Sequence, residues 1–129
     1  MNYLHFAAVG LGAALGAWSR WLLGLLLNPL VQGIPLGTLA ANLSGGYLVG
    51  VALGLFHLHA GISPVLKLFV ITGFLGGLTT FSTFSAESTE RLLSGQTGMA
   101  VLMIALHLFG SLLLTFLGLA TVGAIRIWS

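Results

Sequence analysis

Residues 73 to 84 read Gly-Phe-Leu-Gly-Gly-Leu-Thr-Thr-Phe-Ser-Thr-Phe. This stretch holds four hydroxyl groups and a glycine pair, and it ends with two phenylalanines three positions apart, in a chain made mainly of Leu, Ala, Gly and Val. Lipid offers no hydrogen-bond partners for backbone groups that are freed from a helix. A stretch this poor in helix formers is therefore expected to line a protected cavity or a pore, and we place the functional site here.

The composition of the chain is that of an integral membrane protein. Of its 129 residues, 57% are hydrophobic, and only four Lys or Arg and two acidic residues are charged, whereas about 25% of a soluble domain is charged. The chain has no Cys, and its acidic side chains are Glu87 and Glu90. This excludes disulfides, thiolate metal sites and an Asp-containing catalytic triad, and it disfavours a paired-carboxylate hydrolase. Two spare positive charges are too few for a nucleic-acid-binding patch, so we expect neither an enzyme nor a nucleic-acid partner.

Four apolar runs are long enough to cross a bilayer, since a core of ~30 Å needs about 20 helical residues. They cover residues 4–27, 36–57, 65–84 (continuing toward residue 93) and 99–128. The connections between them are short and carry Pro, Gly, Gln and Ser, as turns do. The sequence therefore predicts an all-α integral membrane protein, in which residues 1–129 form a single transmembrane domain.

The positive charges do not favour one orientation of these spans. Arg20 and Arg91 fall on one side of the predicted membrane, and Lys67 and Arg126 fall on the other. Because Lys and Arg near span ends normally set orientation, a two-against-two balance favours insertion in both directions and pairing of opposite copies as an antiparallel homodimer. The alternative is a single orientation that is set by interfacial aromatic residues, the free amino terminus or the insertion machinery.

Small residues recur every fourth position in the second span, at Thr38, Gly46, Gly50 and Gly54, and Asn42 lies in the same row. Such a row lets another helix come close. An amide in hydrocarbon is unfavourable unless it is hydrogen-bonded, so Asn42 points either at a partner helix, as a link between helices, or at an aqueous cavity. Comparable rows occur in the first span at Ala8, Gly12, Gly16 and Arg20, and in the fourth at Ser111, Thr115 and Gly118.

The third span carries the aromatic and hydroxyl residues at helical spacing. Phe81 and Phe84 form one row, Ser82 lies in a neighbouring one, and Thr83 shares a face with Glu87. A phenylalanine pair at this spacing more often packs than binds. However, ring edges carry partial positive charge, and amide and hydroxyl groups donate hydrogen bonds, so this region is suited to weak passage of an anion.

The remaining polar residues give weaker signals. Arg20 lies between Trp18 and Trp21 and is expected to anchor the span at the interface, or else to draw anions toward a vestibule. Glu87 and Glu90 are expected to be solvated. The four histidines are scattered along the chain, and the sequence assigns them no role: His5, His57, His59 and His107.

The stretch 73–84, together with Asn42-Leu43-Ser44-Gly45-Gly46, resembles the signature of the Fluc (CrcB) family of fluoride channels. The length, the four spans and the balanced charge resemble that family over essentially the whole chain. The resemblance implies four transmembrane helices with a broken third helix, assembled in the bacterial inner membrane as an antiparallel homodimer. Each dimer would contain two anion pores, lined from both subunits, which let fluoride leave the cytoplasm passively.

The resemblance also implies roles for individual residues. Phe81, Phe84 and Asn42 would line the fluoride pore, with Ser82, Thr83 and Thr115 as a polar track. The backbone carbonyls of Gly76 and Thr79 from both copies would hold a structural sodium ion, beside a break at the glycine pair 76–77. Candidate vestibule residues are Arg20, Ser111 and Glu87.

Two rival functions are consistent with the size of the chain. A small dual-topology, proton-coupled drug transporter would share the four spans, but it needs a membrane-embedded carboxylate, and the first span has none. A non-transporting assembly subunit would explain the rows of glycine but not the unusual third span.

Overall fold

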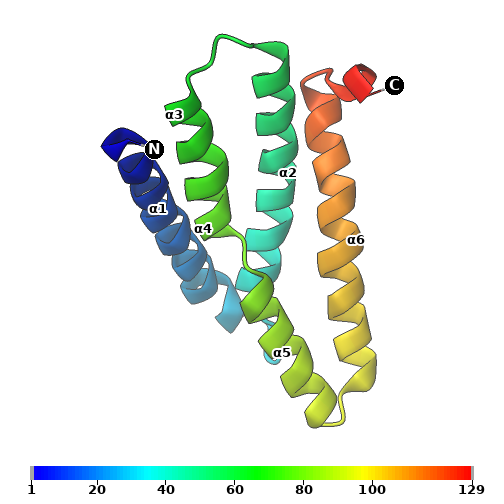
Figure 1. The fold of residues 1–129 in the computed structure, drawn as a ribbon. Coiled ribbons are helices and arrows are strands. Elements are labelled where there is room, and N and C mark those ends of the chain that lie inside the picture. Colours follow the sequence, from blue (N-terminus) through cyan, green and yellow to red (C-terminus); the bar gives the residue numbers. More distant parts are fainter. Residues whose placement is uncertain (1, 129) are drawn as a thin grey trace.

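The computed structural model describes residues 2–128, which form helices and connecting turns. Four helical stretches are long and apolar enough to cross a membrane, as the sequence predicted: Tyr3–Leu30, Leu36–Leu58, Pro64–Leu93 and Thr97–Thr121. The first contains α1 (Tyr3–Leu27) and a short 3-10 turn, η1 (Asn28–Leu30); the second is α2 (Leu36–Leu58), and the fourth is α6 (Thr97–Thr121). Successive stretches run in opposite directions, and both chain ends lie at the same end of the molecule (Figure 1).

The third stretch consists of four segments. They are α3 (Pro64–Lys67), the π-helical segment η2 (Leu68–Leu75), α4 (Gly76–Leu78) and α5 (Phe81–Leu93). Ser63 caps the start of α3 by accepting a hydrogen bond from the backbone N–H of Leu66 at 3.2 Å.

The chain leaves helical geometry at Thr79 and Thr80, whose backbones are extended (φ −86°, ψ 154° and φ −148°, ψ 120°). The sequence placed this break at the glycine pair, but both glycines are helical in α4. The reason is packing: a Cβ at Gly77 would overlap the backbone of Ala13 on α1, so this glycine provides room for a helix contact. Thr80 starts the next helix, because its hydroxyl accepts the N–H of Thr83 at 3.1 Å and so caps the N-terminus of α5.

The fourth helix is shorter than predicted. It ends at Thr121, the chain turns at Gly123 with a φ of +71°, and Ile125–Trp128 form a separate 3-10 turn, η3. A positive φ is accessible to glycine without steric strain. Gly123 therefore stops the helix before the apolar run of the sequence ends.

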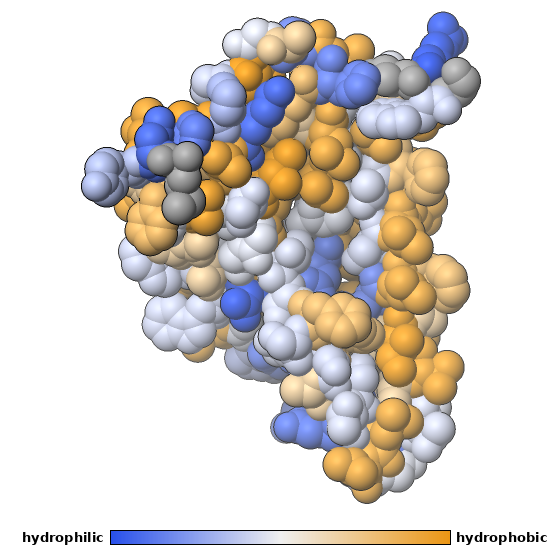
Figure 2. All heavy atoms as spheres, viewed as in Figure 1, coloured by the Kyte–Doolittle hydropathy of each residue, from blue (hydrophilic) through white to orange (hydrophobic). Residues whose placement is uncertain are grey.

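The predicted rows of small residues form the helix contacts. A Cβ at Gly16 of α1 would overlap the carbonyl oxygen of Phe74 in η2, and one at Gly50 of α2 would overlap that of Thr115 in α6. Backbones are therefore in direct contact in both helix pairs, as small residues allow in membranes. The outer surface is apolar, and Figure 2 shows hydrophobic side chains along α6, where Leu113 and Phe116 are exposed.

Candidate functional site

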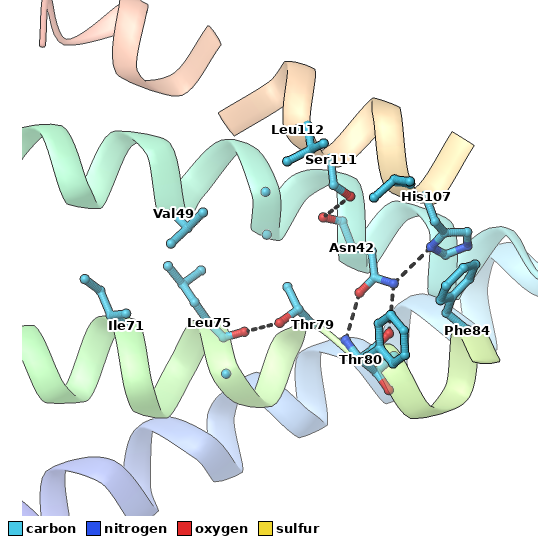
Figure 3. Close-up of a pocket in the computed structure, with 15 residues that line it drawn as sticks. Asn42, Val49, Ile71, Leu75, Thr79, Thr80, Phe84, His107, Ser111 and Leu112 are labelled. Atoms are coloured by element: carbon cyan, nitrogen blue, oxygen red, sulfur yellow. Dashed lines mark hydrogen bonds between the residues drawn. The ribbon is translucent and has the colours of Figure 1, made fainter. Parts of the chain in front are cut away.

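A cavity of about 450 Å³ opens at the break in the third stretch, between α2, η2, α4, the start of α5 and α6 (Figure 3). We call it the central cavity. Its lining consists of Asn42, Gly45, Gly46, Val49, Ile71, Leu75, Gly76, Thr79, Thr80, Phe81, Phe84, His107, Leu108, Ser111 and Leu112. The lining is mostly apolar, contains no charged side chain, and gathers its polar groups around Asn42.

Asn42 joins α2 to the break. Its Oδ1 accepts the backbone N–H of Thr80 at 2.8 Å, and its Nδ2 donates to the carbonyl of the same residue at 2.9 Å. Thr80 is buried, with 8% of its surface exposed, and these bonds replace the helical partners that its backbone lacks. Asn42 therefore both links helices and lines the cavity, which combines the two interpretations that the sequence left open.

His107 on α6 completes this cluster. Its Nδ1 lies 3.0 Å from Asn42 Nδ2, and the residue is only 4% exposed. Because Thr80 orients the Asn42 amide, Nδ2 is the donor and the imidazole Nδ1 is the acceptor, so the proton of the neutral ring lies on Nε2. The Nε2 atom is buried and has no hydrogen-bond partner among residues 2–128.

Phe81 and Phe84 lie beside this cluster. Their ring centroids are 5.5 Å apart with an interplanar angle of 72°, an edge-to-face arrangement. Phe84 also lies against the ring of His107, with centroids 4.6 Å apart and planes tilted by 33°. Phe81 is 79% exposed in the single chain, so most of its ring is free to contact another molecule.

Thr79 and Thr80 of the third stretch line the cavity, whereas Ser82 and Thr83 lie at the start of α5 outside the lining. Thr80 Oγ1 donates to Thr83 Oγ1 at 3.1 Å and lies 3.3 Å from Ser82 Oγ. Thr115 on α6 lies apart from them, and its hydroxyl lies 2.9 Å from the carbonyl oxygens of both Gly46 and Ser111. Ser82, Thr83 and Thr115 thus border the central cavity without lining it.

The break takes the usual helical donors away from two backbone carbonyls, those of Gly76 and Thr79. The N–H of Thr80 donates to Asn42 and so does not bond the carbonyl of Gly76, and the N–H of Thr83 donates to Thr80 Oγ1 rather than to the carbonyl of Thr79. The carbonyl of Gly77, which follows Gly76 in the chain, accepts a hydrogen bond from Arg20 Nε at 3.2 Å. Gly76 and Thr79 both line the central cavity, and carbonyl oxygens of this kind are hard ligands suited to alkali ions.

The three candidate vestibule residues occupy different environments. Ser111 lines the central cavity, and Arg20 bonds Gly77. Glu87 lines a second cavity of about 510 Å³ at the far end of α5, with Glu90 and Arg91, and its Oε1 accepts the hydroxyl of Thr38 at 2.7 Å. Glu87 is therefore half-buried and tied to α2, and not fully solvated as the sequence suggested, because the hydroxyl of Thr38 holds its carboxylate.

Residues 7–119 match the model of the family described as CrcB-like protein, Camphor Resistance (CrcB). The chain belongs to the CrcB family. Several relatives are named Fluoride-specific ion channel FluC. One from Dechloromonas aromatica (strain RCB) is 64% identical over 129 residues, covering 100% of this chain and 96% of the relative. Those from Ralstonia pickettii (strain 12J) and Acinetobacter baumannii (strain ACICU) are 60% and 57% identical, covering 95% and 92% of this chain and 97% and 94% of theirs.

His107 and Thr80 are polar lining residues of this CrcB protein to which the sequence interpretation assigned no role. A signal was present, because His107, Ser111 and Thr115 follow one another at four-residue spacing on one face of α6. His107 is therefore the first residue of a polar row that continues with Ser111 and Thr115. Its burial and its contacts with Asn42, 65 residues away in sequence, and with Phe84 distinguish it from the other three histidines, which are exposed or half-buried.

Proposed function

We propose that this protein is a passive, highly selective fluoride channel that lets fluoride leave the cytoplasm across the bacterial inner membrane. The observation that carries the proposal is 64% identity, along the whole chain, to a relative named Fluoride-specific ion channel FluC. The central cavity supports it, because the lining combines uncharged hydrogen-bonding groups with aromatic edges. Without a fixed positive charge, an anion binds weakly enough to leave again, as conduction requires.

Fluoride is small and strongly hydrated, so the pore has to replace its water with close donors. The edges of the Phe81 and Phe84 rings supply partial positive charge, and the polar groups around Asn42 supply hydrogen bonds. In this proposal Ser82, Thr83 and Thr115 continue the path as a polar track beside the cavity. Close coordination by these groups would exclude the larger chloride ion.

The active unit in this proposal is an antiparallel homodimer with two pores. The open side of the central cavity and the 79% exposure of Phe81 in the single chain favour closure by a second copy. The balance of Lys and Arg between the two sides of the predicted membrane favours insertion in both orientations. Each pore would then be lined by residues from both subunits.

A sodium ion between the two copies is a further part of the proposal. The carbonyl oxygens of Gly76 and Thr79 fit it chemically, because they are neutral hard ligands whose usual helical donors are bound elsewhere. One chain supplies only part of an alkali-ion ligand set, so a twofold axis would bring two such pairs together. The ion would tie the two breaks together and add positive charge near the anion path.

The test is fluoride efflux from liposomes that contain the purified protein, measured with a fluoride electrode while potassium and valinomycin clamp the voltage. Fast efflux that does not depend on a proton gradient is the expected result. Efflux that requires a proton gradient would support the transporter instead, and no efflux from correctly folded protein would support an assembly subunit. Protein-free liposomes give the background rate.

A further inference from the structure

We propose that His107 donates a hydrogen bond from Nε2 to the anion at the central cavity and so takes part in selecting fluoride. The inference rests on the proposed function and assigns the donor at its site. It follows from the hydrogen bonds around Asn42, from the burial of the imidazole and from the contact between this ring and Phe84.

Asn42 has no N–H left for an anion. A side-chain amide carries two N–H groups. One donates to the carbonyl of Thr80 at 2.9 Å, and the other faces Nδ1 of His107 at 3.0 Å. The expectation that Asn42 itself donates to fluoride would require one of these bonds to break. The N–H that remains free in this cluster is that of His107 Nε2.

The backbone of the break sets the position of this proton. The N–H of Thr80 fixes the Asn42 oxygen, so the Asn42 nitrogen faces the imidazole and requires an acceptor at Nδ1. The neutral ring then carries its proton on Nε2. In this arrangement Asn42 is the positioning residue, and His107 is the residue that touches the anion.

The surroundings of Nε2 suit a small, dehydrated anion. The rings of His107 and Phe84, with centroids 4.6 Å apart and planes tilted by 33°, bring their edges close to each other. A polar N–H edge and a partially positive C–H edge therefore lie next to each other. Burial of an unsatisfied donor is unfavourable, which gives a ligand at this position a driving force to bind.

Burial also makes the position selective. His107 is only 4% exposed, so an anion reaches its Nε2 only after it has lost most of its water and the side chains around the ring have shifted. The smallest halide needs the smallest shift. Chloride would have to displace the neighbouring side chains further, against the packing of α5 on α6.

Three substitutions separate donation to an anion from support of Asn42. His107→Gln places an amide N–H near the position of Nε2, whereas His107→Asn places an oxygen near Nδ1, and His107→Leu removes both groups. If the anion loses its hydrogen bond from His107 Nε2, its binding free energy becomes less favourable, and fluoride efflux should fall about 10- to 100-fold. We expect the Gln variant to keep most of the flux, and the Asn and Leu variants to lose it.

The opposite ranking, with the Asn variant active and the Gln variant inactive, would overturn the inference and leave His107 as a support for Asn42. Equal flux in all three variants would overturn it as well. Wild-type efflux is measured first, because its absence would reject the proposed function before any variant is compared. His57→Gln and His57→Asn are matched controls, since His57 contacts Trp128 outside the central cavity, and they should leave flux unchanged.

A spectroscopic measurement tests the same proton without relying on flux. In protein with ¹⁵N-labelled histidine and the substitutions His5→Gln, His57→Gln and His59→Gln, His107 is the remaining histidine. We expect the nitrogen shifts of a neutral ring protonated at Nε2, and a change of the Nε2 resonance on titration with fluoride but not with chloride. A proton on Nδ1, or no response to fluoride by a protein that conducts it, would overturn the inference.

Discussion

Removal of the Asn42 side chain is expected to destabilise the break in the third stretch. In Asn42→Ala, the buried N–H and carbonyl of Thr80 both lose their partners. An unsatisfied buried group costs about 1–3 kcal/mol, so the two together give about 2–6 kcal/mol. Hydrogen bonds between membrane helices average only about 0.6 kcal/mol, because the unfolded state in the membrane finds other partners. We therefore expect the lower part of that range, about 2–3 kcal/mol.

The measurement is SDS-induced unfolding in mixed micelles, followed by the fluorescence of the three tryptophans. Ser44→Ala is the matched control on the same helix, because Ser44 is exposed and, within residues 2–128, its hydroxyl bonds only the carbonyl of Ala41 at 3.2 Å. Its free energy of unfolding should change by less than about 0.5 kcal/mol, as for most surface substitutions. An Asn42→Ala protein as stable as the Ser44→Ala protein would refute the role of the Asn42 bridge.

Asn42→Asp separates the structural role of this residue from its role in conduction. The carboxylate can still accept the N–H of Thr80, but its second oxygen would face the Thr80 carbonyl and Nδ1 of His107, which are both acceptors. A negative charge beside an anion path also repels fluoride. We expect fluoride efflux at neutral pH to collapse even if the dimer still elutes normally. Wild-type efflux from this variant would show that the anion does not pass Asn42.

Four further outcomes are expected. Phe81→Ile and Phe84→Ile should each abolish fluoride efflux with a normal elution profile, because they keep apolar volume but remove the polarised ring edge; wild-type flux in both would mean that the rings only pack. Gly50→Ala should destabilise the protein by about 1–3 kcal/mol, since the added Cβ meets backbone on α6, whereas Gly10→Ala, with nothing within 4 Å, should not; equal unfolding curves would contradict this packing. Exhaustive exchange of sodium for N-methylglucamine should lower flux or dimer stability, and titration with sodium should restore it; no change after verified removal would leave the ion without a role. Two lysines added at the C-terminus should force one orientation and inactivate the protein unless an oppositely biased copy is co-expressed; full activity from a population that cysteine labelling shows to be uniformly oriented would reject the antiparallel dimer.

The sequence alone determined the four membrane-crossing stretches and the faces on which they pack. Apolar runs of bilayer length predict spans whatever their neighbours are, and small residues at four-residue spacing predict close helix contacts. The rows that include Gly16 and Gly50 form such contacts in the structure. Asn42 was recognised as a residue that needs a partner, because hydrocarbon offers it none.

The tertiary structure decided where the third stretch breaks and which groups meet there. Local sequence favoured a break at the flexible glycines, but contact with α1 keeps Gly77 helical, and the extended residues are Thr79 and Thr80. The meeting of Asn42 with His107 depends on the relative height and rotation of α2 and α6. Helical periodicity fixes the face on which a residue lies but not the height at which the opposite helix meets it, and the unpartnered nitrogen of His107 emerges only when the helices are packed.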